Sequence, residues 1–382
     1  MSSNKSSKIK ESNIELLRII SMFYIVLYHL IIHSNMISNS IGLTKYTFLL
    51  IESLTLVHVN SFILITGYFQ SNSKFKSRKI LSLNNQVWFY KVVIPIALII
   101  LGIIAIPDTV TIFKTIMPID YGTYWYVNTY ILLYLLSPFL NKIINGLSKK
   151  NFKLLLTLLI IFISFIPTFT RDESFNTYSG RSLITFILLY FIGAYIRKYS
   201  VEDDIFEKKS TPSNRKKIFF GGYILLTIIS FVFVSIGIRL ERCNATLQYI
   251  GIILQNFHAS YASPIIILQT VCYFLLFKNI KIKSKIINFV SSYTFSVYLI
   301  SENAFARSSL YSYFGFDIIS NYSFKWIIYS ILISCFIFVL CICIELIVNF
   351  ITKQISKLSI ISNQKEKIYS KLKNVDLLLN NL

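Results

Sequence analysis

The chain has 382 residues, of which 54% are hydrophobic and 14% are charged, and its mean hydropathy is +0.62. These values exclude an ordinary soluble domain and predict an all-α polytopic membrane protein. The formal net charge is +21, but the basic residues lie mainly at the ends of the apolar runs. That placement indicates membrane topology and attraction to anionic membrane lipids, so nucleic-acid binding is not expected.

Apolar runs that approach the length needed to cross about 30 Å of hydrocarbon occur ten times along the chain. They cover residues 14–34, 47–69, 86–106, 125–144, 152–170, 181–197, 217–238, 258–277, 286–302 and 326–351. Loops rich in Lys and Arg alternate with loops poor in them, which predicts about ten transmembrane helices with both termini cytoplasmic. Residues 1–352 are expected to form one membrane domain, and the basic tail, 353–382, an amphipathic helix on the inner membrane surface.

The first run, NIELLRIISMFYIVLYHLIIHS, carries two ionisable side chains, Arg18 and His29. Such residues within a membrane span usually face the protein interior and serve a function. Eleven positions at about 100° each return to nearly the same helix face, about 16 Å further along the axis. The two side chains are therefore predicted to line one path, with Arg18 near one end and His29 well inside.

The histidines and cysteines are the candidate metal ligands of this sequence. His33 follows His29 by four residues, a spacing at which two helical histidines can bind zinc. No third ligand accompanies the pair in this run, so neither a metal site nor a bound cofactor is expected. Four of the five cysteines lie inside predicted spans, so disulfides are not expected either. His58 and His258 also fall in spans, where each can be a hydrogen-bonded interior group.

Five stretches of sequence, in order along the chain, carry a resemblance to a known family. They are NIELLRIISMFYIVLYHL, with ten residues between Arg18 and His29; NSFILITGYF, residues 60–69; YWYVNTYILLYLLSPFLN, residues 124–141; YASPIIILQTVCYFLLF, from Tyr261; and SSYTFSVYLISEN, from Ser291. Together they resemble the integral-membrane acyltransferase 3 family, which O-acetylates bacterial surface polysaccharides. The resemblance covers almost the whole chain and implies a multi-pass protein of the bacterial plasma membrane.

The chain departs from the family pattern at three places. Thr66 stands where the second motif more usually has Ser. Ser301 precedes Glu302 where the closing motif commonly has His, so the role of that imidazole does not carry over, whereas the carboxylate is retained. The loop after Phe69 reads SNSKFKSRK in place of an Arg-rich pair, and lysine cannot reproduce the bidentate fork of arginine.

The resemblance implies transfer of an acetyl group from cytoplasmic acetyl-CoA to a polysaccharide or lipid-linked glycan outside the membrane. A neutral imidazole suits removal of the acceptor's hydroxyl proton, so His29 is the candidate general base. Arg18 is a candidate catalytic and donor-binding group at the inner end. Glu302 is a candidate for orienting the histidine or for binding acceptor hydroxyls.

Two further groups of side chains are candidates for holding the substrates. The candidates for the CoA phosphates are the inner-loop residues Lys76, Arg78 and Lys79, which can equally be topological charges. The candidates for the acceptor are the aromatic residues at the start of the fourth run, Tyr124, Trp125 and Tyr126. Sugar rings stack on aromatic faces, but aromatic side chains at a membrane interface are also common anchors.

Two alternative functions stay open on the sequence. A transporter or flippase of a lipid-linked glycan would line its pathway with the same buried charges and would consume no thioester. The sequence has no strong internal repeat of the kind that gives many transporters their inverted halves, which counts mildly against this alternative. A succinyl or other acyl donor would keep the mechanism and change only the group that is transferred.

Overall fold

The computed structural model describes residues 11–117, 124–171, 177–199, 211–313, 324–355, 370 and 372–381. Regular structure in these ranges is helical, with no strand among them, which confirms the all-α prediction. In chain order the helices are α1 (Ser12–His33), α2 (Gly42–Thr55), α3 (His58–Gln70), α4 (Ser77–Ile100), α5 (Thr109–Ile116), α6 (Trp125–Gly146), α7 (Lys149–Leu159), η1 (Ile160–Phe165), α8 (Ile166–Thr170), η3 (Tyr178–Gly180), α9 (Leu183–Tyr199), α11 (Pro212–Leu240), α12 (Ala245–Ala259), α13 (Pro264–Lys278), α14 (Lys285–Ser291), α15 (Thr294–Ser301), α16 (Ala304–Tyr313) and α17 (Phe324–Ile355). A further helix covers residues 372–380, and we call it the C-terminal helix.

Eight helical segments of the described chain are long and apolar enough to cross a membrane. They coincide with eight of the ten predicted runs, so the polytopic prediction is confirmed. The run at 181–197 corresponds to α9, which has 17 residues. The run at 286–302 corresponds to α14 and α15, two short helices that are interrupted at Ser292 and Tyr293.

The run expected at 258–277 is longer in the structure, where α12 and α13 together extend over Ala245–Lys278. The first half was missed because polar residues interrupt its apolar pattern. One of them, Asn256, faces the interior, and its side-chain amide donates to the backbone oxygen of Thr168 at 2.8 Å. A span whose polar groups are satisfied inside the protein does not need an unbroken apolar sequence.

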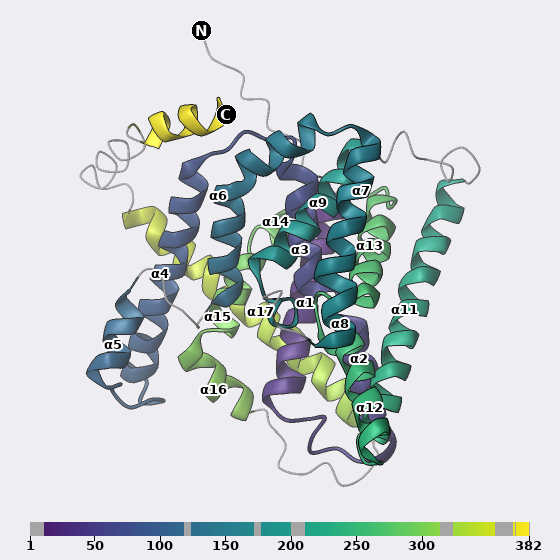
Figure 1. Ribbon diagram of the computed structural model, residues 1–382. Helices are drawn as coiled ribbons and strands as arrows, with labels where there is room; N and C mark the ends of the chain where they lie inside the picture. The colour runs from purple at the N-terminus through teal and green to yellow at the C-terminus, as the bar shows by residue number, and fades with distance from the viewer. Residues whose placement is uncertain are drawn as a thin grey trace.

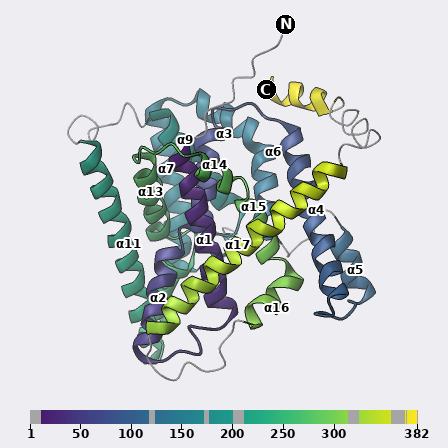
Figure 2. The same ribbon diagram turned by 180° about the vertical axis from the view of Figure 1, so that it is seen from behind.

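Helix α1 is the central element of the bundle and packs against α2, α3 and α13 to α17. Figure 1 places α11 on one side of the bundle and α4 with α5 on the other, and Figure 2 shows α17 crossing obliquely over α1. The start of α1 and the C-terminal helix lie at the same end (Figure 1). This end carries the lysine-rich loops, and by the positive-inside rule we call it the inner end.

Helices α3 and α9 pack closely through two glycines. A Cβ atom at Gly67 would lie 2.2 Å from the backbone oxygen of Tyr190, and one at Gly193 would lie 2.3 Å from the backbone oxygen of Leu64. Small residues allow such close approach of helix backbones inside a membrane. This crossing fixes the position of α3, and Val59, Phe62, Ile65 and Thr66 of this helix line the cavity described below.

Several spans are broken part of the way along their length. Helix α2 gives way to α3 at Leu56 and Val57, and α12 gives way to α13 between Ser260 and Ser263. Helix α15 ends at Ser301, and α16 starts at Ala304. Non-helical backbone at membrane depth is tolerated only where it is buried in protein or lines a cavity.

Hydrogen bonds satisfy the backbone at the α12–α13 break. The Tyr261 N–H donates to the backbone oxygen of Ser179 at 2.9 Å, and the Asn60 amide donates to the backbone oxygen of Tyr261 at 2.8 Å. Gly180 makes this approach possible, because its φ is +83° and an added Cβ would lie 2.3 Å from the Ala262 nitrogen. These contacts hold the loop before α9 against the α12–α13 break. Arg181 follows directly after this loop.

Candidate active site

One cavity of about 610 Å³ extends along α1 between α3, α6 and the α14–α15 pair. Arg18 lines it towards the inner end, and His29 lines it about 16 Å further along the helix axis. Glu302 lines the same cavity. The volume is within the range of ordinary small-molecule sites, which is about 300–1,000 Å³.

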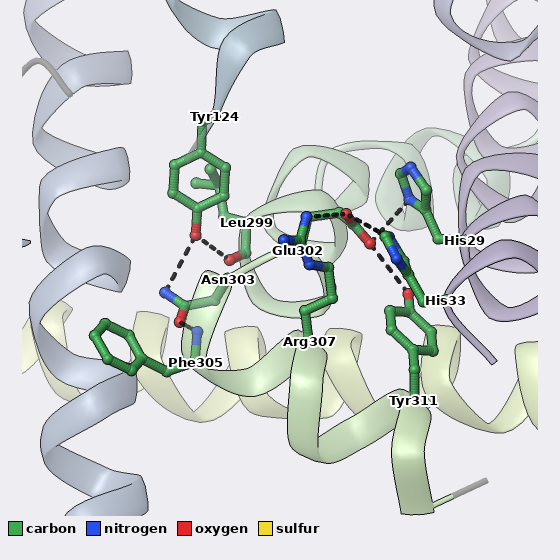
Figure 3. Close-up of polar contacts among 9 residues, drawn as sticks. All are labelled: His29, His33, Tyr124, Leu299, Glu302, Asn303, Phe305, Arg307 and Tyr311. Carbon is green, nitrogen blue, oxygen red and sulfur yellow. Dashed lines mark hydrogen bonds and ion pairs between the residues drawn. The ribbon is translucent and has the colours of Figure 1, made fainter. Parts of the chain in front are cut away.

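A histidine and a carboxylate meet in the outer half of this cavity. His29 Nδ1 lies 2.9 Å from Glu302 Oε1, and the Glu302 side chain is only 7% exposed (Figure 3). Glu302 is the C-cap of α15, so the break before α16 brings its side chain back towards α1. The Tyr311 hydroxyl donates to the same Oε1 at 3.2 Å. The carboxylate is thus buried, but it has partners from both α1 and α16.

Two further groups lie near the second oxygen of Glu302. His33 Nε2 and Arg307 Nη1 are each 3.8 Å from Oε2 (Figure 3). Ser301, which stands where the family motif has a histidine, is fully buried. Besides His29, the imidazole near Glu302 is that of His33, which comes from α1.

The donor atoms of His29, His33 and Glu302 all lie within 4.8 Å of one another. Two imidazoles and a carboxylate are a donor set suited to Zn²⁺. Arg307 and Tyr311 already contact the same carboxylate, and the guanidinium charge opposes a second cation there. The sequence did not suggest this set because its third donor comes from the far end of the chain.

Arg18 at the inner end of the cavity is paired with a residue that the sequence analysis did not single out. Its Nη1 lies 3.2 Å from Glu15 Oε1, one turn earlier on α1. Ser291 on α14 donates to the other oxygen of Glu15, whose side chain is 10% exposed. The i,i+3 spacing of an acidic and a basic residue was the available signal. This contact fixes the guanidinium while leaving its side chain 33% exposed.

Aromatic side chains contribute much of the wall of the cavity between these two ends. Trp125, Tyr126 and Tyr130 line it from the first turns of α6. The Trp125 ring lies 6.4 Å from the Tyr261 ring, and the Arg181 guanidinium lies 5.9 Å from the Trp125 ring. Tyr261 lies in the α12–α13 break, and Arg181 follows the loop that is bonded to this break, so both segments help to enclose the cavity.

Tyr124 lies outside the cavity lining. Its hydroxyl donates to the backbone oxygen of Leu299 at 2.6 Å and accepts a hydrogen bond from the Asn303 amide at 3.3 Å (Figure 3). These contacts connect the start of α6 to the break after α15. Tyr124 therefore supports the backbone beside Glu302.

The other two histidines are buried in hydrogen-bonded environments and are not among the cavity-lining residues. His58 Nδ1 lies 2.6 Å from the backbone oxygen of Thr55, so this nitrogen carries the proton. Nε2 of His58 is then an acceptor for the Tyr261 hydroxyl at 3.1 Å. His258 Nδ1 is 2.9 Å from the Ser230 hydroxyl, and its Nε2 is 3.2 Å from Glu52.

The inner-loop cations lie outside this cavity too. The Lys76 N–H donates to the Tyr134 hydroxyl at 3.1 Å, just before α4 begins, and the Lys76 side chain is exposed. Lys79 Nζ is 3.5 Å from Gln70 Oε1 and 5.4 Å from the Tyr134 ring centre. Arg78 is exposed. The loop is thus close to the inner ends of α3 and α6, which also contribute to the cavity wall.

The fold and the cavity define a polytopic membrane protein that encloses ionisable side chains suited to acid–base chemistry among its spans. Residues 11–346 match the acyltransferase 3 family, described as an acyltransferase domain. The chain belongs to this family and is a membrane acyltransferase. No curated protein and no solved structure shows significant similarity to it.

Proposed function

We propose that the protein is an O-acetyltransferase of the plasma membrane that moves an acetyl group from cytoplasmic acetyl-CoA to a hydroxyl of a cell-surface or exopolysaccharide glycan. The observation that carries the proposal is that the same cavity has Arg18 towards its inner end and the His29–Glu302 pair in its outer half. This arrangement suits a reaction whose two substrates arrive from opposite sides of the membrane.

His29 acts as the general base in this proposal. Glu302 faces Nδ1 at 2.9 Å, which favours the tautomer with the proton on that nitrogen. Nε2 then has a free lone pair to accept the acceptor's hydroxyl proton. A carboxylate in this position also stabilises the imidazolium that forms as the proton is transferred. Glu302 is thus assigned the positioning role, through its contact with the imidazole.

The acceptor oxygen forms a bond to the thioester carbonyl carbon while its proton passes to His29 Nε2. The resulting tetrahedral intermediate collapses, the carbon–sulfur bond breaks, and the imidazolium gives its proton to the departing thiolate. The products are an acetylated glycan, CoA with a free thiol, and neutral His29.

Arg18 is assigned to the donor and not to the reacting carbonyl. About 16 Å of axial separation prevents it from touching the atoms that His29 deprotonates. Its pairing with Glu15 at 3.2 Å orients the guanidinium at the inner end, where the pantetheine arm would enter. Glu15 is therefore proposed as a positioning residue for Arg18.

The acceptor is proposed to occupy the outer half of the cavity. Trp125 and Tyr126 both line the cavity, and aromatic side chains are groups against which a sugar ring packs well. Arg307 lines the same region and is held towards Glu302. A glycan is a good match for aromatic faces combined with charged hydrogen-bonding groups.

The O-acetyl content of the surface glycan tests this function. Proton NMR before and after mild alkali would compare cells that carry the intact protein with cells that lack it. Acetyl signals that depend on the protein and disappear with alkali support the proposal. Alkali-labile succinyl signals would instead indicate a different donor. Unchanged acylation with altered glycan export would contradict acyl transfer to this glycan.

A further inference from the structure

Three arginines line the cavity that contains His29, and they differ in their partners. Arg18 Nη1 lies 3.2 Å from a carboxylate oxygen of Glu15. Arg307 Nη1 lies 3.8 Å from a carboxylate oxygen of Glu302. The third is Arg181, and no carboxylate of the described residues forms an ion pair with it. The described lining therefore carries one guanidinium charge that its two acidic side chains do not balance.

The backbone before Arg181 has an unusual conformation. Tyr178, Ser179 and Gly180 have φ angles of +43°, +55° and +83°, a region that residues other than glycine rarely adopt. The Arg181 N–H donates to the Tyr178 backbone oxygen at 3.0 Å, and Ser179 accepts from the Tyr261 N–H at 2.9 Å. Strained backbone persists where the surroundings determine it, and it is concentrated at functional sites. This turn therefore fixes the position of Arg181 beside the cavity.

The Arg181 guanidinium is held by an aromatic ring and remains accessible. It lies 5.9 Å from the centre of the Trp125 ring, which in turn lies 6.4 Å from the Tyr261 ring. A cation–π contact holds a guanidinium without occupying its N–H donors. Arg181 is exposed, although it lines the cavity. Its planar fork can therefore donate two parallel hydrogen bonds to a carboxylate or a phosphate.

A series of ring contacts connects this region with the candidate base. The Tyr261 hydroxyl lies 3.1 Å from His58 Nε2. The Tyr28 ring lies 5.0 Å from the His58 ring and 5.5 Å from the His29 ring. Tyr28 and Tyr261 both line the cavity. Through these contacts Arg181 is placed next to the aromatic residues around His29, in the part of the cavity that is proposed for the acceptor.

From these observations we infer that the acceptor glycan is anionic and that Arg181 binds its carboxylate or phosphate group. The inference rests on the proposed function, because it names the class of acceptor for that reaction. A charge in an enclosed cavity is stabilised by a counter-charge, and the glycan supplies the one that the lining lacks. Trp125, next to the guanidinium, suits the sugar ring that carries the anion. Arg181 determines which acceptor is bound and takes no part in proton transfer.

The fluorescence of Trp125 measures binding beside Arg181. The chain has three tryptophans, so Trp88→Phe combined with Trp326→Phe leaves Trp125 as the single reporter. The first pair of probes is digalacturonate and its methyl ester, which share their sugar rings and differ in charge. The second pair, maltose 1-phosphate and maltose, makes the same comparison for a phosphate. All are added to the full chain in lipid nanodiscs.

We expect the charged member of at least one pair to bind about tenfold more tightly than the neutral member, because it forms hydrogen bonds between charged groups. This preference should decrease as the ionic strength rises. The pair with the larger preference identifies the anion as a carboxylate or a phosphate. Absence of a charge preference in both pairs would overturn the inference.

Variants of Arg181 assign the preference to this residue. Arg181→Gln removes the charge and is expected to abolish the preference. Arg181→Lys keeps the charge but loses the planar fork, so part of the preference should remain. Arg171→Gln makes the same change at an exposed arginine that ends α8 and does not line the cavity, and it should bind like the intact protein. A preference that survives in Arg181→Gln would overturn the assignment.

Kinetics separate this inference from the proposed function. Arg181→Gln should raise the KM for the acceptor glycan and leave kcat and the KM for acetyl-CoA unchanged. A change confined to the KM for acetyl-CoA or succinyl-CoA would place the bound anion on the donor and overturn the inference. Acetyl transfer to a glycan that has no anionic group would overturn the inference alone. Charge-selective binding without any acyl transfer would support the anion site and count against the proposed function.

Discussion

Each end of the cavity that contains His29 pairs a carboxylate with a nitrogen-containing side chain, but the two pairs are built in different ways. At the inner end, Glu15 and Arg18 lie one turn apart on the same helix and are 3.2 Å apart. In the outer half, His29 and Glu302 come from opposite ends of the chain and are 2.9 Å apart. One pair is set by the local spacing of α1, whereas the other exists only because α15 is broken at Glu302.

This difference in construction parallels a difference in chemistry. Arginine keeps its charge at any physiological pH, so the inner pair can hold an anionic or polar donor but cannot move a proton. Histidine exchanges protons near neutral pH, so the outer pair can take part in proton transfer. The comparison predicts that substitutions in the outer half reduce turnover, while substitutions at the inner end mainly weaken donor use.

The largest effect is expected for His29→Ala. Loss of the general base should lower kcat by about 10²–10⁴-fold, measured with labelled acetyl-CoA and membranes that contain the acceptor glycan. His33→Ala is the matched control, because it removes an imidazole one turn further along the same helix. A small effect of His33→Ala is expected. Equal turnover by a well-inserted His29→Ala protein would remove the base assignment.

The next largest effect is expected for Arg18→Lys. The substitution keeps the charge but removes the planar fork, and it should lower kcat/KM for acetyl-CoA by about 10- to 100-fold, mostly through KM. Glu15→Gln should shift KM in the same direction by a smaller factor, since it only releases the guanidinium. A fall in kcat with an unchanged KM would show that Arg18 acts on the reacting atoms, and would erase the contrast between the two ends.

A moderate effect is expected for Glu302→Gln. The amide can still contact the imidazole, but it cannot stabilise the imidazolium. We expect kcat to fall by about 10- to 100-fold with little change in the KM for the donor, by analogy with other groups that orient a histidine. The measurement is the separation of kcat from KM in the same membrane assay. A change confined to the KM for the acceptor would assign Glu302 to glycan binding instead.

The smallest effect is expected for metal removal. Although His29, His33 and Glu302 bring three possible ligands within 4.8 Å, the proposed mechanism needs His29 as a free base. Dialysis of the purified protein against EDTA should therefore leave the rate of transfer unchanged within about twofold. Loss of activity that is restored by Zn²⁺ would identify the three residues as a metal site.

The membrane class, most spans and the α1 residues could be predicted because they depend on composition and on helical periodicity. Arg18 and His29 are visible as ionisable residues in an apolar run, and their common cavity follows from α-helix geometry. The break at α12–α13 and the position of Glu302 against α1 could not be predicted in this way. Both depend on contacts between segments far apart in sequence, such as the Asn60 amide on Tyr261.

Tyr124, Trp125 and Tyr126 illustrate the same limit within three adjacent residues. The sequence placed all three at an aromatic helix start, where each could contact a glycan. In the structure Trp125 and Tyr126 line the cavity, whereas the Tyr124 hydroxyl is bonded to the backbone of α15. Which way each ring points is set by the neighbouring helices α9 and α15, and not by the local sequence.

The central claim is that one cavity joins a donor at the inner end to a base in the outer half. Its most direct test is acetyl transfer in sealed membrane vesicles of known orientation, supplied with labelled acetyl-CoA from outside. Inverted vesicles, whose cytoplasmic face is accessible, should acetylate the glycan, and right-side-out vesicles should not. Equal labelling in both orientations, in vesicles shown to be impermeable to CoA, would contradict the account.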